Sequence, residues 1–542
     1  MNLKNWDMTS FRAMNKHCDP VCIDLFAGPG GLGEGFAARG FSIAVSIEKE
    51  AVECETLFRR KLYRKLVASG QAKYAKQVVD NNLSKQDIHA QFPKMAEAAD
   101  FEVAQLELGS VPFREVYERI NSALLGSSSH PKILLGGPPC QAYSIVGRSR
   151  NIGKSKVSEN PQLLHEFYED ARHTLYREYL KVLSAFGPEV FIMENVKGIL
   201  SAKTGQGAEK GSVINNIISD LLNPSGALEL DIEFQTELED LGVRATSSNY
   251  VLVPLVESAE DDLLKGTNET PRPSDFLIRC EEHGIPQTRH RVIICGIRDD
   301  VFRALGKPRQ LSKNKSAVTL RQVIGSLPNL RSNITRQNVS EHDWSYKVSK
   351  EIERLASIKN PRVQKNAPVE SVPRKASVIG NKDLSDFLED TAEYITAHKT
   401  RSHMISDLAR YYFCADFAER MGRSPKIQDW PVGRLAPEHK DIRNEGNRLS
   451  SSGFSDRFKV QLWQKPASTI TSHISKDGHY FIHPDKTQCR SFSVREAARI
   501  QTFPDSYHFC GGISKQFHQI GNAVPPYLAF QIAQLLGEYL QG

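Results

Sequence analysis

Apolar and polar positions alternate along the chain in blocks that have the lengths of strands and helices. An apolar run at residues 21–26 precedes a glycine-rich turn, and an amphipathic stretch at residues 32–39 ends at Gly40, which predicts a strand, a loop and a helix. A second apolar run at residues 41–47 predicts the next strand. This order is typical of the opening of a doubly wound α/β sheet.

Later segments repeat the pattern but are separated by long polar stretches. Short apolar runs predict strands at residues 132–135, 189–193 and 291–297. Residues 50–100 are polar with helical periodicity, and residues 200–275 are also longer than a crossover requires. We interpret both stretches as insertions and assign no function to them.

The character of the sequence changes between about residues 330 and 460. Apolar periodicity weakens there, and charged residues, Pro, Asn and Ser are scattered throughout. Helical periodicity returns at residues 492–503 and again at residues 526–540. The middle stretch is therefore expected to form a separate, smaller and less regular domain or a large insertion.

Composition places the chain in the class of water-soluble globular proteins. The 542 residues are 40 % hydrophobic and 25 % charged, and no apolar run approaches the roughly 18 residues of a membrane helix. The first residues lack the apolar core of a secretory signal. Nine cysteines occur without a Cys-x-x-Cys pair, which disfavours a disulfide framework or a zinc ribbon. We expect a cytoplasmic protein.

Positive charge is concentrated in one part of the chain. The formal net charge is only +6, but residues 301–380 contain 16 Lys and Arg against 5 Asp and Glu, a local surplus of +11. Because neutralised phosphates supply most non-specific affinity for nucleic acids, such a block favours a polyanionic partner. A solvated basic linker is the alternative interpretation.

Cys140 is a candidate nucleophile. It follows the predicted strand 132–135, two glycines, and Pro138 and Pro139. Open α/β sheets bind ligands at the carboxyl ends of their strands, and two ring-locked prolines would hold the thiol there. Considered alone, a single cysteine is more often a small buried hydrophobic residue.

Two further segments carry candidate charged groups at the same edge of the sheet. Glu194 follows the predicted strand 189–193 and is placed to bond a ring nitrogen, although a helix-capping or surface Glu is the commoner case. Arg289 and Arg291 alternate at the start of the predicted strand 291–297, so both can project toward one site. Paired guanidiniums suit carbonyl or phosphate oxygens, and a surface ion-pair cluster is the alternative.

The glycine-rich turn is typical of a nucleoside-binding loop. Gly28, Gly30 and Gly31 let the backbone approach a ligand closely, and Glu48 at the end of the next strand can accept both ribose hydroxyls. Such loops serve NAD, FAD and S-adenosylmethionine alike. No Gly-Lys-Ser/Thr follows, which disfavours a phosphate-binding P-loop.

Three histidines raise the possibility of a metal site. They lie at positions 473, 479 and 483, in a turn-rich stretch without the helical spacing of ligands. We therefore expect no metal.

Taken together, these segments resemble the C5-cytosine DNA methyltransferase family. The matching segments, in family order, are Asp24-Leu25-Phe26-Ala27-Gly28-Pro29-Gly30-Gly31, Gly137-Pro138-Pro139-Cys140-Gln141, Glu194-Asn195-Val196, Gln287-x-Arg289-x-Arg291, Arg495-Glu496-Ala497-Ala498-Arg499-Ile500-Gln501 and Gly521-Asn522-Ala523-Val524. The resemblance implies a Rossmann-like sheet that binds S-adenosyl-L-methionine.

The resemblance also implies a role for each matching residue. Cys140 would attack C6 of a cytosine flipped out of the duplex, and Glu194 would hold and protonate N3. Arg291 would contact O2, with Arg289 supporting the site or the backbone. The S-adenosyl-L-methionine pocket would be lined by Phe26, Gly28, Gly30, Gly31, Glu48, Pro138, Leu175, Asn522 and Val524, with Ser110 as the candidate for a further contact to adenine.

Domain organisation and partners follow from the same resemblance. A catalytic and cofactor-binding domain would span residues 1–325, completed by residues 512–542, and residues 326–511 would form the target-recognition domain. The expected partner is double-stranded DNA, with Arg148, Arg150 and the following lysines on a loop that closes over phosphates. The resemblance also implies that the protein belongs to a restriction–modification or related defence system, in which the restriction endonuclease would be a separate protein.

The sequence departs from the family at two places and leaves other functions open. Tyr143 stands where the family usually has Phe, and the acidic residue after the third strand has no clear counterpart, for which Ser110 is the best candidate and Asp87 a poorer one. The alternatives are the tRNA-methylating branch of the family, a catalytically silent nucleic-acid-binding protein, and an NAD-dependent oxidoreductase that shares only the glycine loop.

Overall fold

The structure is a computed structural model. It describes residues 20–79, 83–125, 132–139, 175–203, 209–257, 271–337, 339–364, 367–371, 380–390, 395–431, 435 and 458–541. Cys140, Tyr143 and the predicted basic loop lie outside the described residues.

The chain divides into two compact units. Unit 1 comprises residues 1–283, 290–313 and 524–542, and unit 2 comprises residues 284–289 and 314–523. The border expected from the sequence lies at residue 325, whereas this division assigns residues 314–325 and 512–523 to unit 2.

Unit 1 is built around an eight-stranded sheet with the order β3-β2-β1-β4-β5-β9-β6, in which β7 also pairs with β9. The strands are β1 (Val21–Leu25), β2 (Ser42–Glu48), β3 (Val103–Gln105), β4 (Lys132–Gly136), β5 (Val190–Val196), β6 (Tyr250–Val253), β7 (Leu277–Arg279) and β9 (His290–Arg298). The first five strands pair in parallel, and β9 runs antiparallel to β5. The order reverses between β1 and β4, which confirms the doubly wound sheet and makes this the point where such folds bind ligands.

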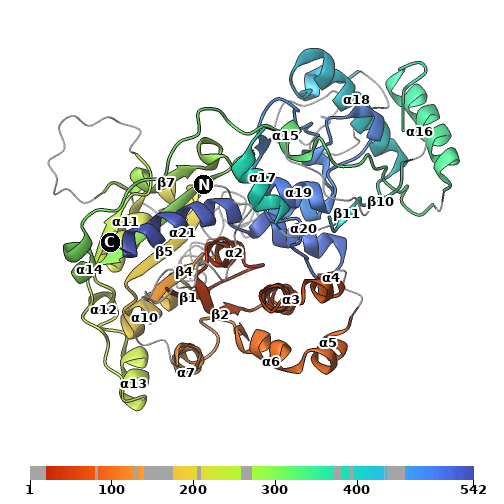
Figure 1. Cartoon of the computed structure of the whole chain (residues 1–542). Coiled ribbons are helices and arrows are strands. Elements are labelled where there is room, and N and C mark those ends of the chain that lie inside the picture. The colour runs from red at the N-terminus through yellow and green to blue at the C-terminus, as the bar shows by residue number, and fades with distance from the viewer. Residues whose placement is uncertain are drawn as a thin grey trace, which may run out of the picture. The chain divides into compact units, whose positions relative to one another are not determined.

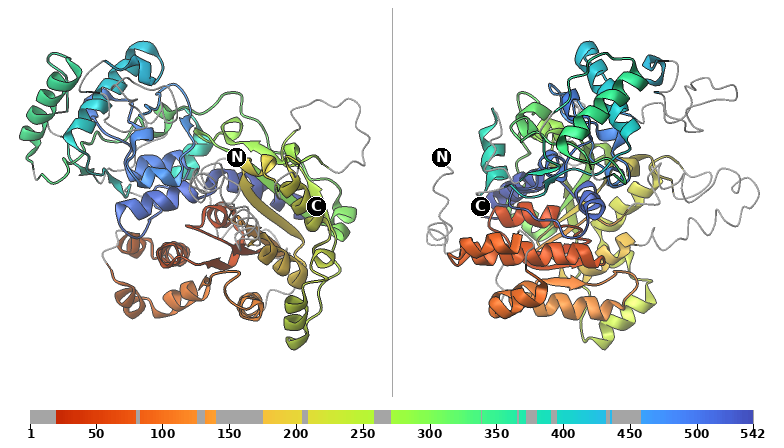
Figure 2. Two further views of the ribbon diagram at one scale, coloured as in Figure 1. Left: turned by 180° about the vertical axis from the view of Figure 1, so that it is seen from behind. Right: turned by 90° about the vertical axis from the view of Figure 1, so that its right-hand side faces the viewer.

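Helices cover both faces of this sheet (Figures 1 and 2). The helices of unit 1 are α2 (Gly31–Ala38), α3 (Ala51–Ala68), α4 (Ala72–Val79), α5 (Lys85–Gln91), α6 (Pro93–Phe101), α7 (Phe113–Leu124), α10 (Leu175–Phe186), α11 (Ser212–Leu222), α12 (Pro224–Ala227), α13 (Ile232–Asp240), α14 (Asp299–Leu305) and α21 (Pro526–Leu540). Helices α7, α10 and α11 share one hydrophobic core with the sheet, while α2 packs on the other face beside α21.

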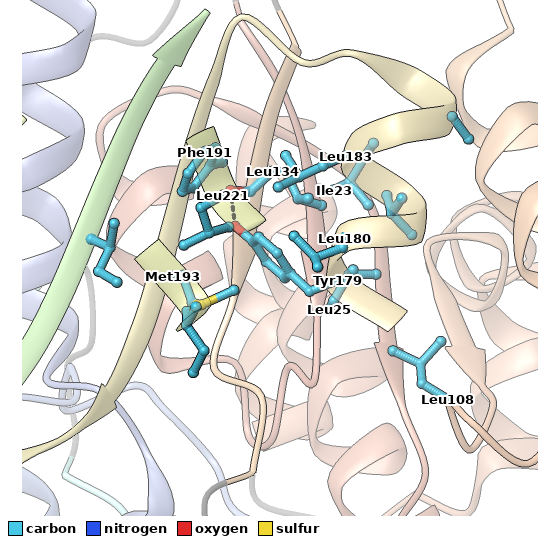
Figure 3. Close-up of a cluster of buried hydrophobic side chains, with 14 of the residues drawn as sticks. Ile23, Leu25, Leu108, Leu134, Tyr179, Leu180, Leu183, Phe191, Met193 and Leu221 are labelled. Carbon is cyan, nitrogen blue, oxygen red and sulfur yellow. Dashed lines mark hydrogen bonds between the residues drawn. The ribbon is translucent and has the colours of Figure 1, made fainter. Parts of the chain in front are cut away.

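Tyr179 anchors the core between β4 and β5 (Figure 3). This fully buried side chain projects from α10, and its hydroxyl lies 3.1 Å from the Leu134 carbonyl and 3.0 Å from the Ile192 carbonyl. A Cβ at Gly136 would be only 2.6 Å from the Tyr179 ring. The glycine at the end of β4 is therefore required for α10 to pack closely on the sheet.

The contact between α2 and α21 also depends on a glycine. A Cβ at Gly35 would lie 2.4 Å from the backbone nitrogen of Phe530 and 2.4 Å from the carbonyl oxygen of Pro526. Because backbone atoms cannot move aside as a side chain can, any larger residue would separate the two helices. The helix that follows the glycine loop is thus supported by a segment near the other end of the chain.

The predicted insertion at residues 50–100 is helical. Helices α3 to α6 form a small hydrophobic cluster of their own, centred on Phe58, Leu62 and Phe92. The second half of α3 is connected to α2 by Glu34, which is 4 % exposed and forms ion pairs with Arg60 (2.6 Å) and Arg64 (2.8 Å).

Unit 2 contains short elements and many buried polar groups. Its helices are α15 (Leu320–Ile324), α16 (Glu341–Ala356), α17 (Lys382–Glu389), α18 (Ile405–Met421), α19 (Val494–Ile500) and α20 (Ile513–Asn522), and its strands are β8 (Gln287–Thr288), β10 (Glu370–Ser371), β11 (His398–Lys399) and β12 (Ala467–Ser468). Arg490 and Glu496, each 1 % exposed, form a two-fold hydrogen-bonded ion pair at 2.7 Å. Charged side chains therefore occupy buried positions in this unit.

None of the helices in the described part of the chain has the length and apolarity needed to cross a membrane.

Candidate active site

The ends of β4 and β5 meet where the sequence predicts the nucleophile. Gly136 pairs with Met193 across the two parallel strands. A Cβ at Gly137 would lie 3.1 Å from the Glu194 Oε2, so a glycine makes room for the carboxylate. The segment that leads to Cys140 therefore runs beside Glu194, although Cys140 itself is outside the described residues.

Strand β5 is longer than the sequence indicates, and this affects Glu194. The apolar run ends at Met193, but pairing with β9 continues through Glu194 and Asn195 to Val196, which lies opposite Arg291. Glu194 is thus a strand residue with a fixed backbone. The reason is that the antiparallel neighbour β9 supplies hydrogen bonds beyond the point where β4 ends.

Glu194 and Arg291 are brought together. The Arg291 Nε lies 2.7 Å from the Glu194 Oε1, and the two side chains are 12 % and 14 % exposed, respectively. Nη1 of Arg291 also donates to the His290 carbonyl at 2.8 Å. Two of the predicted catalytic groups therefore form one ion pair that keeps some access to solvent.

Arg289 has different partners from Arg291. It precedes β9, belongs to unit 2, and is 1 % exposed. Its guanidinium donates to the carbonyl oxygens of Ile470, Gly521 and Ala523. The structure thus gives Arg289 backbone acceptors, which fits the supporting role among the roles that the resemblance implies.

The glycine loop between β1 and α2 has the backbone that the sequence predicts. Phe26, Gly28 and Gly30 have positive φ angles of 53°, 56° and 85°, and Gly30 is the residue before α2. A Cβ at Gly28 would have no atom within 4 Å, so space is open beside the loop. Left-handed backbone and open space together are what a closely approaching ligand needs.

Glu48 is hydrogen-bonded to the backbone of this loop. Its Oε2 accepts from the Gly28 N–H at 2.8 Å, and its Oε1 accepts from the N–H groups of Lys49 (2.8 Å) and Glu50 (2.9 Å). Burial raises the pKa of this carboxyl, and the three backbone donors act in the opposite direction. Carboxylate oxygens have further lone pairs, so Glu48 fits the hydroxyls of a ribose.

The remaining predicted cofactor residues occupy several elements. Leu175 begins α10, and its Cδ2 would be 3.1 Å from a Cβ at Gly109, next to the exposed Ser110. Val524 lies in unit 1 just before α21. Asn522 ends α20 in unit 2, where its exposed amide is 3.3 Å from the His518 Nδ1. Pro138 accepts a long contact of 3.5 Å from the Asn195 amide.

Glu107 is a candidate that the sequence analysis missed. It comes two residues after β3. Its carboxylate forms an ion pair at 3.2 Å with Lys49, which directly follows Glu48 in the sequence. Asp87, in contrast, caps the exposed helix α5 in a capping box with Ser84. The available signal was an acidic residue between two leucines just after the third strand.

Two of the three histidines considered as metal ligands in the sequence analysis contact other side chains. His479 accepts or donates a hydrogen bond with the Tyr411 hydroxyl at 2.7 Å, and His483 lies 3.5 Å from Glu496. Among the described residues, no three His, Cys, Asp or Glu side chains are grouped as metal ligands.

Asp24 is a buried acid beneath the glycine loop. Burial raises its pKa from 3.8 to about 7, the charge of Glu48 acts in the same direction, and Lys61 opposes both. A Cβ at Gly33 would be 2.8 Å from the Asp24 Oδ2, so the carboxylate lies against the first turn of α2. The folded protein therefore holds the Asp24 proton more tightly than the unfolded chain does.

Replacing Asp24 with Asn should change how stability depends on pH. The wild type is expected to lose up to about 4 kcal/mol as pH rises from the unfolded pKa of about 4 to the folded pKa of about 7, because ionising a buried carboxyl is unfavourable. The variant lacks this loss, so its relative stability grows over that window in urea unfolding. The exposed Asp87→Asn serves as a control with the opposite sign, since hydrogen bonds from Ser84 lower the pKa of Asp87. Parallel curves for wild type and Asp24→Asn would contradict the prediction.

Comparisons with known proteins agree with this geometry. A family model described as C-5 cytosine-specific DNA methylase matches residues 109–223 and 276–538. The chain is 30 % identical to a type II methyltransferase of Bacillus paralicheniformis over 541 residues, which covers 96 % of this chain and 99 % of the relative. It is 25 % identical to a type II methyltransferase of Thalassovita gelatinovora, covering 95 % of this chain and 98 % of that one.

Proposed function

The chain belongs to the C-5 cytosine-specific DNA methylase family and is an enzyme that methylates cytosine in DNA at C5, and from this premise we propose how its residues carry out the reaction. Cys140 is the nucleophile, Glu194 the acid at N3 and Arg291 the contact to O2. The single observation that supports these roles best is the Glu194–Arg291 ion pair beside the segment that leads to Cys140.

The chemistry begins with the low reactivity of cytosine. C5 becomes nucleophilic only after the Cys140 thiolate adds to C6. The electrons of the C5–C6 double bond then form a double bond between C4 and C5, and the electrons of the C4–N3 double bond move onto N3, where negative charge develops. Glu194 takes up a proton from water when the incoming base separates it from Arg291, and it donates this proton to N3 as the charge on N3 develops, which is the task of a positioned general acid. Bound S-adenosyl-L-methionine would supply the methyl group from its sulfonium. The C5 proton then passes to water, the sulfur leaves C6 with its electron pair, and the N3 proton returns to Glu194.

The Glu194–Arg291 pair prepares both groups for the base. In the free protein each charge is compensated by the other at 2.7 Å. A cytosine carries N3 and O2 side by side. It can therefore replace the contact between the two side chains with two contacts of its own, Glu194 to N3 and Arg291 to O2. Because N3 is paired with guanine and the faces of the ring are covered by neighbouring bases in stacked DNA, the base must leave the helix.

S-adenosyl-L-methionine is the cofactor that we propose for the glycine loop. Phe26, Gly28, Gly30 and Gly31 would approach it through the backbone, and Glu48 would receive its ribose. Glu107 joins this set beside Ser110 as a second candidate for the contact to adenine. The remaining proposed contacts are Pro138, Leu175, Asn522 and Val524.

We place the enzyme in a type II restriction–modification system. The support is that the relatives are named type II methyltransferases and align over nearly their whole length. Double-stranded DNA would be recognised by residues of the expected domain 326–511, and a restriction endonuclease would be a separate protein.

Bisulfite sequencing tests the function directly. The chain is expressed in a host without cytosine methylation, and one short sequence should become resistant to conversion at a single cytosine. The host tRNA is sequenced in the same way as a control. Methylation of tRNA with unmodified DNA would favour the tRNA branch, and no methylation of either would reject the proposed activity.

A further inference from the structure

Arg289 connects two segments of unit 2 that are distant in the sequence. Its guanidinium is 1 % exposed, and Nη1 donates to the Ile470 carbonyl at 2.7 Å. Nη2 donates to the carbonyl oxygens of Ala523 (2.8 Å) and Gly521 (3.3 Å). The planar fork of an arginine fixes the directions of its donors, so these segments keep a defined relative position.

Gln287 strengthens the connection on the side of residue 470. Strand β8 pairs with β12, with Gln287 opposite Ala467. The Gln287 Oε1 accepts from the Ile470 N–H at 2.9 Å, and its Nε2 donates to the Gln501 Oε1 at 2.6 Å. The segment 467–470 is thus bonded to the same short stretch that carries Arg289.

Gln501 and Gly521 complete the connection on the other side. The Gln501 Nε2 donates to the Ala523 carbonyl, which Arg289 also holds. A Cβ at Gly521 would lie 2.3 Å from the Ser472 nitrogen and 2.3 Å from the Thr471 carbonyl carbon. A displacement of residues 467–472 therefore cannot occur without moving the end of α20.

Asn522 lies in the sequence between Gly521 and Ala523, whose carbonyl oxygens both accept hydrogen bonds from Arg289. Its backbone is fixed on both sides, whereas its side chain is exposed. This is the residue of unit 2 to which we assign a contact with the cofactor. The segment 467–472, on the other hand, belongs to the region that we assign to DNA recognition.

We propose that Arg289 is a positioning residue that couples DNA binding to cofactor binding by linking segment 467–472 to Asn522. This proposal rests on the proposed function. Each ligand would favour the same arrangement of the linked segments, so each would strengthen binding of the other by the same factor. Arg289 would then have no contact with the flipped base, in contrast to Arg291.

Arg495 provides a matched control. It is fully buried like Arg289, and it donates to the backbone carbonyls of Thr396 (2.8 Å), Pro504 (2.9 Å) and Tyr507 (2.8 Å). These acceptors lie, like segment 467–472, in the region that we assign to DNA recognition, but none of them adjoins a residue to which we assign a contact with the cofactor. Loss of either guanidinium should therefore cost similar stability, but only the loss of Arg289 should affect coupling.

The test measures the affinity for S-adenosyl-L-homocysteine by calorimetry, with and without a duplex that carries the sequence found by bisulfite sequencing. In the wild type the duplex should tighten binding about tenfold, a usual size for coupling between sites. Arg289→Lys should reduce this factor to near one, and Arg495→Lys should preserve it at a comparable loss of thermal stability. Gln501→Met, a milder change, should reduce the factor in part if Arg289→Lys does not fold.

Three results would overturn the proposal. These are a wild type without coupling, equal coupling in Arg289→Lys and Arg495→Lys, and full coupling in Arg289→Lys together with a collapse of kcat, which would make Arg289 catalytic. In the double variant with Asn522→Ala, Arg289→Lys should have no additional effect on coupling. A failure of the proposed function is distinguishable, because it would leave no methylated sequence in the wild-type bisulfite experiment.

Discussion

Replacing Cys140 with Ser should lower methyl transfer to duplex DNA by more than about 10⁴-fold, the scale reached when a covalent enzyme loses its nucleophile. A serine hydroxyl ionises far less readily than a thiol, so addition to C6 would become the limiting step. The measurement is incorporation of a labelled methyl group from S-adenosyl-L-methionine, together with trapping on a duplex that contains 5-fluorocytosine.

The trap identifies the attacking atom. With fluorine at C5 no proton can leave, so the wild type should remain covalently attached to the DNA after methyl transfer, and Cys140→Ser should not. A buried cysteine of the sheet, Cys295, gives the control, since Cys295→Ser should still form the adduct. If Cys140→Ser formed the adduct as well, another residue would have to be the nucleophile.

Replacing Glu194 with Gln should lower kcat by about 10²- to 10⁴-fold, the usual contribution of a general acid. The amide can accept or donate hydrogen bonds but cannot deliver a proton to N3. Affinity for S-adenosyl-L-homocysteine should change little, because Glu194 lies at the end of β5 and the glycine loop follows β1. Single-turnover kinetics and calorimetry measure the two quantities separately.

Glu189 offers a matched control for this variant. It lies just before the same strand β5 at its opposite end and also pairs with an arginine, Arg298, at 3.0 Å. Glu189→Gln should destabilise the fold without a comparable loss of kcat. Near-normal turnover by Glu194→Gln would refute its assignment as the acid.

Much of unit 1 could be predicted because apolar runs are bounded by strong local signals. The first strand was expected at residues 21–26 and is found at Val21–Leu25, and the last helix was expected and is found at Pro526–Leu540. Gly30 and Gly40 flank α2 with positive φ angles that other residues rarely adopt, and Pro525 precedes the last helix with its ring-locked φ. The α/β class and the family were confirmed on the same signals.

The parts that could not be predicted depend on distant partners. Arg289 meets carbonyls 181 and 232 positions away, so spacing alone placed it beside Arg291. Glu107 was missed because β3 is only three residues long and gives little periodicity. In unit 2, arginines such as Arg490 are buried through ion pairs, which hydrophobic patterning cannot detect. The assigned roles of the site residues remain predictions.

The packing of α2 against α21 has a consequence for synthesis on the ribosome. Gly35 in α2 makes room for the backbone of Pro526 and Phe530, which are translated long afterwards. Until then the nascent chain exposes an apolar surface next to the glycine loop, a situation that invites chaperone binding. Methylation of DNA would accordingly begin only after α21 has emerged, which delays activity relative to the start of translation.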